Sequence, residues 1–160
     1  MLGTLFPGVQ HLQNIHPLVV HFPIAFLVGA ALFYALAWVL RKDTLATAAF
    51  SVLILGAISA AAAVGTGLYA EDGVMIARSV RARLLDHHAE LMITTLLLTV
   101  GLTVWAALAR PFPRKGRLIF MAVLLGILVV MSFGADYGAR MVYDYNAGGK
   151  ACSQPIEFTK

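Results

Sequence analysis

Charged residues are scarce in this sequence. Only 12% of its 160 residues are Asp, Glu, Lys or Arg, whereas about 25% is typical of a soluble domain. Hydrophobic residues make up 60% of the chain, compared with roughly 45–50% in soluble proteins. The composition therefore excludes an ordinary soluble domain, and the length allows a single domain.

Cysteine and the usual catalytic motifs are also nearly missing. The single cysteine, Cys152, excludes an internal disulfide and a CxxCH haem attachment. The sequence shows no nucleophile–base pair, phosphate-binding loop or paired carboxylates, so we predict no independent enzymatic activity. The first residues have no early Lys or Arg and no cleavage site, so no removable signal peptide is expected.

Long apolar runs dominate what is present. Each of four segments approaches the roughly 20 residues that a helix needs to cross a bilayer, and backbone groups in lipid require helical hydrogen bonds. We therefore predict an all-α integral membrane four-helix bundle over residues 1–149 and an extramembrane tail over residues 150–160. The predicted helices cover residues 19–40, 45–70, 89–109 and 118–143.

The connection over residues 71–88 is longer than the others. It is long enough for an amphipathic helix in the plane of the membrane interface, because apolar residues alternate with Arg78, Arg81 and Arg83. An ordinary solvated loop is the alternative. Both termini and this connection are expected on the same side of the membrane, because the number of helices is even.

The two short turns indicate the orientation. One contains Arg41 and Lys42, and the other is the basic, proline-containing tract over residues 110–117. Short basic loops favour the cytoplasmic side of a membrane. We therefore expect these turns inside the cell and both termini outside.

Histidines gather near one membrane face. His16 and His21 lie at the start of the first predicted helix, and His87 and His88 precede the third. Ionisable groups at membrane depth are unfavourable, so a functional site is the default hypothesis for them.

Two prolines predict an irregular start of the first helix. Pro17 suits a first helical turn, but Pro23 cannot form the hydrogen bond back to Val19. The helix therefore either begins at Pro17 and kinks, or begins near Pro23 after a bent leading segment.

One haem b is the most specific cofactor that the histidines suggest. His21 and His88 lie just inside the apolar zone at similar depth on different helices, as two axial ligands must. His16 and His87 are then expected beside the ligands or at a second site. Groups that could bind the haem propionates are Arg78, Arg81, Arg83, Arg140, Tyr69 and Tyr137.

Two other interpretations stay open. A zinc, copper or non-haem iron site would combine histidines with Glu90, Asp86 or Asp136, although the spacing matches no known metal motif. Alternatively, His21 and His88 hydrogen-bond between helices and hold the bundle together.

The end of the fourth helix carries an expected ion pair. Asp136 and Arg140 are four residues apart and share one helical face. Such a pair either neutralises two charges within the membrane or contributes to a propionate site or a proton path.

Three stretches of the sequence form a recognisable pattern. The first is His-Pro-Leu-Val-Val-His-Phe-Pro-Ile-Ala over residues 16–25. The second is a histidine before the third helix, for which His88 fits better than His87. The third is a glycine-rich segment over residues 138–149, at the end of the fourth helix. Together they resemble a bacterial family of predicted four-helix membrane proteins, classed as a domain of unknown function. The resemblance implies the fold, with a layout similar to membrane b-type cytochromes, and implies no settled activity.

Two functional hypotheses follow. The first is a membrane electron-transfer protein, a haem b-binding subunit or anchor of a larger redox complex in the bacterial inner membrane, with membrane or periplasmic redox partners. The alternative is a cofactor-free structural or assembly subunit that packs through small-residue faces. The scattered basic residues indicate no nucleic-acid surface.

Overall fold

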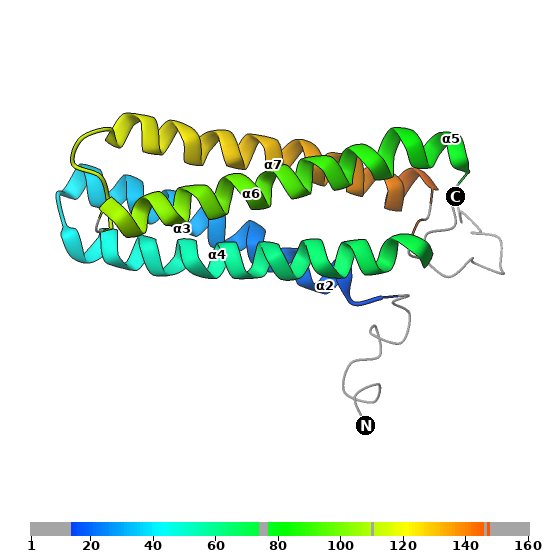
Figure 1. The fold of residues 1–160 in the computed structure, drawn as a ribbon, viewed down its shortest axis with the longest axis horizontal. Helices are drawn as coiled ribbons and strands as arrows, with labels where there is room; N and C mark the ends of the chain where they lie inside the picture. Colours follow the sequence, from blue (N-terminus) through cyan, green and yellow to red (C-terminus); the bar gives the residue numbers. More distant parts are fainter. Residues whose placement is uncertain (1–13, 74–76, 110, 146, 148–160) are drawn as a thin grey trace, which may run out of the picture.

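The computed structural model describes residues 14–73, 77–109, 111–145 and 147 (Figure 1). Within these residues the chain is all-helical, which confirms the predicted fold class. The predicted tail over residues 150–160 lies outside the described residues. Four helical spans are long and apolar enough to cross a membrane: His16–Leu40, Asp43–Gly73, Arg78–Ala109 and Arg117–Tyr145.

The third span begins at Arg78 rather than near Ala89, because a hydropathy pattern marks only the apolar part of a helix. Most of the connection predicted over residues 71–88 is therefore the first part of this span. The elements in chain order are α2 (His16–Val19), α3 (His21–Leu40), α4 (Asp43–Ala70), the 3₁₀ turn η2 (Glu71–Gly73), α5 (Arg78–Val80), the π-helical turn η3 (Arg81–Leu85), α6 (Asp86–Ala109) and α7 (Arg117–Tyr145).

Proline divides the first span. Helix α2 ends at Val19 and α3 begins at His21. Pro23 has no N–H to bond to the Val19 carbonyl, and its ring would collide with that carbonyl in a continuous helix. Pro17 lies in the first turn of α2, where the missing N–H has no effect. The helix thus begins near Pro17 and breaks, which is the first of the two predicted alternatives.

The four spans form a ring of neighbours. Helix α3 packs on α4, α4 on α6, α6 on α7, and α7 closes the ring on α3. Small residues permit the close approach of α3 and α4, since a Cβ atom on Gly56 would lie only 2.9 Å from Cδ2 of Leu27. Packing of this kind stabilises membrane helices in the absence of a hydrophobic driving force between them.

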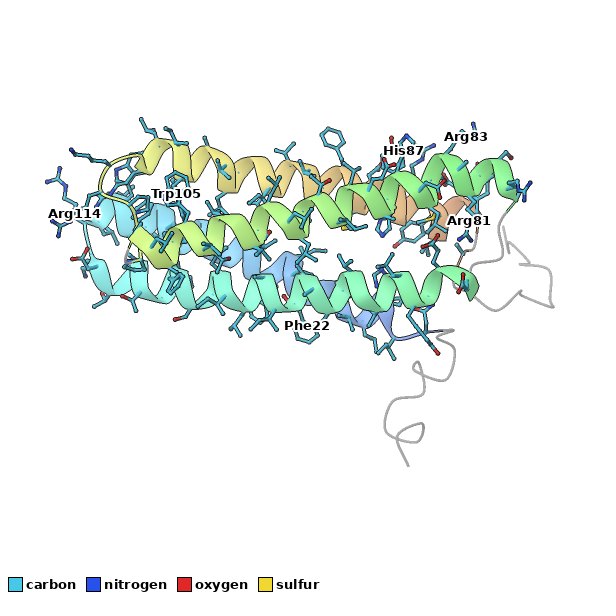
Figure 2. All side chains as sticks on the ribbon, viewed as in Figure 1. Phe22, Arg81, Arg83, His87, Trp105 and Arg114 are labelled. Carbon is cyan, nitrogen blue, oxygen red and sulfur yellow. The ribbon has the colours of Figure 1, made fainter. Side chains whose placement is uncertain are left out.

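The bundle has two distinct ends. We call the end with the α3–α4 turn and the α6–α7 connection the basic-turn end, and the end with His16 and His88 the histidine end. Figure 2 shows Trp105 and Arg114 at the former and Arg81 and His87 at the latter. The main hydrophobic cluster occupies the basic-turn end and the middle of the bundle. A smaller cluster at the histidine end is formed by Val80, Leu84, Leu85 and Met141.

Candidate functional site

His88 is held by a backbone carbonyl of the neighbouring helix. It lies in the first turn of α6, and its Nδ1 atom is 2.7 Å from the carbonyl oxygen of Gly134 in α7. A carbonyl oxygen can only accept a hydrogen bond, so Nδ1 carries the proton and donates it. A neutral His88 ring therefore has its lone pair on Nε2, the tautomer of a histidine that is ready to bind a metal.

The hydrogen bonds of Thr66 give His16 the same tautomer. Its Nδ1 atom lies 3.1 Å from Oγ1 of Thr66 in α4. The single hydroxyl proton of Thr66 is directed to the carbonyl oxygens of Ala62 and Ala63, at 2.9 and 3.0 Å. The hydroxyl oxygen therefore accepts from His16 Nδ1–H, which leaves the His16 lone pair on Nε2.

The two imidazole rings lie next to each other. The ring centroids of His16 and His88 are 6.4 Å apart and their planes are inclined at 84°. A metal–imidazole bond is about 2 Å long, so two imidazoles on opposite sides of one metal ion have centroids roughly 6 Å apart. Two histidines from different helices are a donor set that haem iron accepts, and the centroid spacing would leave room for one metal ion between the rings.

Each of these rings rests on a glycine. A Cβ atom on Gly67 in α4 would lie 2.9 Å from Cε1 of His16, and one on Gly138 in α7 would lie 3.0 Å from Cε1 of His88. Both distances are too short for an undisturbed ring. The absence of side chains at these two positions therefore creates the space that the imidazoles occupy.

The pairing differs from the one predicted. His21 is exposed at the start of α3. The ring next to His88 is that of His16, which was expected beside the ligands or at a second site. Val20 between them keeps helical dihedral angles, and residues five apart on a helix point about 140° away from each other, so the two rings face different directions.

A pocket lies at His87, the neighbour of His88 in the sequence, and collects several predicted residues. It has a volume of about 300 Å³ and opens between η3, the start of α6 and the end of α7. The rings of His87 and Tyr137 are 5.7 Å apart at its wall. Part of the wall is the π-helical turn, a feature that is frequent at functional sites. The lining residues are Val80, Arg83, Leu84, His87, Tyr137, Arg140 and Tyr145.

Other predicted charged residues are engaged or lie outside this pocket. Arg81 forms an ion pair with Glu71 at 2.7 Å, and Arg78 is exposed on α5. The ion pair expected between Asp136 and Arg140 is replaced by one between Arg140 and Asp144, at 3.8 Å. Both spacings place two side chains on one face, so the sequence alone does not select between them.

The described residues do not form the predicted alternative metal site. Within them, no group of three or more His, Cys, Asp or Glu side chains is arranged to hold a metal ion. Sequence reasoning also missed the roles of Thr66 and Gly67. The signal that could have revealed them is the Thr-Gly pair near the end of the second helix, in the segment that faces the first helix.

A comparison with known protein families shows the family to which the chain is related. A family model described as "predicted membrane protein (DUF2231)" matches residues 12–151. The chain belongs to the DUF2231 family. This match includes both imidazoles and both supporting glycines, and the DUF2231 description agrees with the four apolar spans. Searches of curated proteins and of solved structures gave no match.

Proposed function

We propose that this DUF2231 protein is a membrane electron-transfer subunit that binds one haem b through His16 and His88. The observation that carries the proposal is the pair of imidazoles from different helices, 6.4 Å apart, each with its Nδ1 atom in a hydrogen bond. Haem b held in this way supplies a one-electron carrier.

The surrounding residues hold the ligands in place. The Gly134 carbonyl fixes the ring of His88 and the Thr66 hydroxyl fixes the ring of His16. Such hydrogen bonds set the ring orientation and make the ligating nitrogen more basic. In the pocket at His87, Arg83 and Arg140 offer charge-assisted hydrogen bonds to the carboxylates of a bound haem.

The distribution of charge suggests the orientation and partners. Basic residues concentrate in the short turns at the basic-turn end, which favours the cytoplasmic side of a bacterial inner membrane for that end. The histidine end and both termini would then face the periplasm. Electron exchange would take place with membrane or periplasmic redox subunits.

A structural or assembly subunit without cofactor is the second candidate. The same hydrogen bonds tie α2 to α4 and α6 to α7. In bilayers such interhelical bonds average about 0.6 kcal/mol. In that case the histidines would contribute to stability alone.

Visible absorption spectra of the purified protein from haem-replete cells separate the two candidates. We expect a Soret band and sharp bands after dithionite reduction in the wild type, and their loss in both His16→Ala and His88→Ala. His21→Ala is the matched control and should retain the spectrum. A well-folded wild type without a Soret band would refute haem binding, and loss in His21→Ala but not in His16→Ala would restore the pairing predicted from sequence.

A further inference from the structure

A second cavity lies at the opposite end of the bundle from the histidines. Its volume is about 700 Å³, within the roughly 300–1,000 Å³ typical of ligand sites. The α3–α4 turn contributes one side of it and the α6–α7 connection contributes the other. The lining residues are Ala37, Trp38, Val39, Arg41, Lys42, Asp43, Ala46, Phe112 and Arg117.

The cavity wall carries an excess of positive charge. Arg41, Lys42 and Arg117 supply three cations, against the single carboxylate of Asp43. Arg41 has a left-handed backbone conformation, with φ of 53°, and ends α3. This conformation turns the chain sharply, so that Lys42 and Asp43 follow it along the same wall.

Arg117 has an unmet hydrogen-bonding requirement. Its guanidinium carbon lies 5.1 Å from the ring centroid of Phe112, so the planar group is held against an aromatic face. Its Nε atom is buried and finds no hydrogen-bond partner within the part of the chain that the structure describes. A buried donor without an acceptor is unfavourable. Arg117 also lines the cavity, where its guanidinium adds to the positive charge of the wall.

We propose that this cavity binds a phosphate group, carried by an anionic phospholipid. Arginine is the residue best suited to phosphate oxygens, because its donors form a planar fork. Trp38 lines the cavity, and tryptophan is enriched at the level of lipid headgroups. Basic pockets between membrane helices recognise anionic headgroups in this manner.

The surroundings of the cavity suit a lipid better than a soluble anion. Val39, Leu40 and Leu118 flank it and are 77%, 52% and 71% exposed. Apolar side chains this exposed at the end of a membrane span offer a surface for acyl chains. The site is independent of the proposed haem, since it is built from the other end of the bundle.

Native mass spectrometry of the delipidated full chain in neutral detergent tests the proposal. We expect phosphatidylglycerol to bind in preference to phosphatidylcholine with the same acyl chains. Arg117→Gln and Arg41→Asn should each weaken phosphatidylglycerol binding about fivefold, the effect expected of one basic residue near an anionic lipid. Asn is chosen at position 41 because it tolerates the left-handed conformation.

Arg114→Gln and Lys115→Gln are the matched controls, because both residues are exposed cations of the same connection that do not line the cavity. They should retain the lipid preference. Equal binding of the two lipids, or equal losses in the controls and the cavity variants, would overturn the proposal. Displacement of the lipid by inorganic phosphate alone would identify free phosphate as the ligand and overturn the lipid assignment.

Discussion

The two ends of the bundle are packed by different kinds of side chain. At the basic-turn end, the rings of Tyr34, Phe112, Phe120 and Trp105 form a cluster with neighbouring centroids 4.9–5.5 Å apart. At the histidine end, imidazoles rest on glycines, and the described residues form a small hydrophobic cluster. Aromatic pairs stabilise a fold, whereas departures from regular core packing are expected at functional sites.

Under the proposed function, this contrast separates residues that stabilise the fold from residues that bind the cofactor. Substitutions in the aromatic cluster should lower stability without changing the pair of imidazoles. Substitutions around the imidazoles should change cofactor binding more than they change the fold.

The largest effect on stability is expected from Phe120→Ala. Phe120 is completely buried and touches three other aromatic rings. Its removal should lower the free energy of unfolding by about 3–5 kcal/mol, through lost contacts and the cavity left behind. Unfolding by SDS titration in bicelles would measure this loss. Phe133→Ala is the control, because this side chain is 62% exposed, and it should change the free energy of unfolding by much less. Equal losses of stability in the two variants would contradict the distinction between a packed and a lipid-facing ring.

The next effect concerns the glycines under the imidazoles. In Gly67→Ala and Gly138→Ala the new methyl group would contact the ring of His16 or His88 at about 3 Å and force it to move. Overpacking of this kind costs about 1–3 kcal/mol, and we expect weakened haem retention in both variants.

Matched controls for these glycines exist on the same two helices. A Cβ atom on Gly65 or Gly126 meets nothing within 4 Å. Gly65→Ala and Gly126→Ala should keep the haem spectrum, with unchanged or slightly higher stability, because Ala favours the helix. Retention of haem in all four variants would show that the imidazoles are not held as described.

A smaller effect is expected from Tyr34→Phe. The completely buried Tyr34 donates its hydroxyl proton to the carbonyl oxygen of Pro111 at 3.1 Å. Losing this bond should reduce the free energy of unfolding by about 1 kcal/mol and leave the visible spectrum unchanged. Tyr69→Phe is the control for stability, because this side chain is 87% exposed. A change in the haem spectrum of Tyr34→Phe would mean that the two ends of the bundle are coupled.

The smallest effect is expected from the ion pair of Arg81 with Glu71. The two side chains are 33% and 30% exposed, and partly solvated pairs contribute at most about 1 kcal/mol. A double-mutant cycle with Arg81→Gln and Glu71→Gln would measure their coupling energy. A coupling energy several times larger than this would mean that the ion pair, rather than the hydrogen bonds of the imidazoles, is the main contact between helices at the histidine end.

The fold was accessible from the sequence because it depends on segment length and hydropathy. Four apolar runs predict four spans, which is confirmed. Pro17 and Pro23 predict an irregular start of the first helix, and there α2 ends at Val19 and α3 begins at His21. The start of the third span was missed because Arg78, Arg81 and Arg83 make its first turns polar, although they are helical.

The candidate site was only partly accessible from the sequence. Depth along a helix is given by residue number, so the gathering of histidines at one end could be predicted. Rotation about the helix axis is set by packing, and this decides that His16 rather than His21 lies beside His88. The contacts of Gly67 and Gly138 with imidazole rings also depend on packing. For these contacts the sequence offers only small-residue spacing and, at Gly67, the preceding Thr66.

Electron paramagnetic resonance of the oxidised wild-type protein tests the two-imidazole site most directly. Two imidazoles on one haem iron give a low-spin ferric signal, and ring planes inclined at 84° predict the strongly anisotropic form of that signal rather than the rhombic form of parallel rings. The account predicts this signal, and its loss in His16→Ala and in His88→Ala. A high-spin signal, a rhombic low-spin signal, or no haem signal from well-folded protein would contradict it.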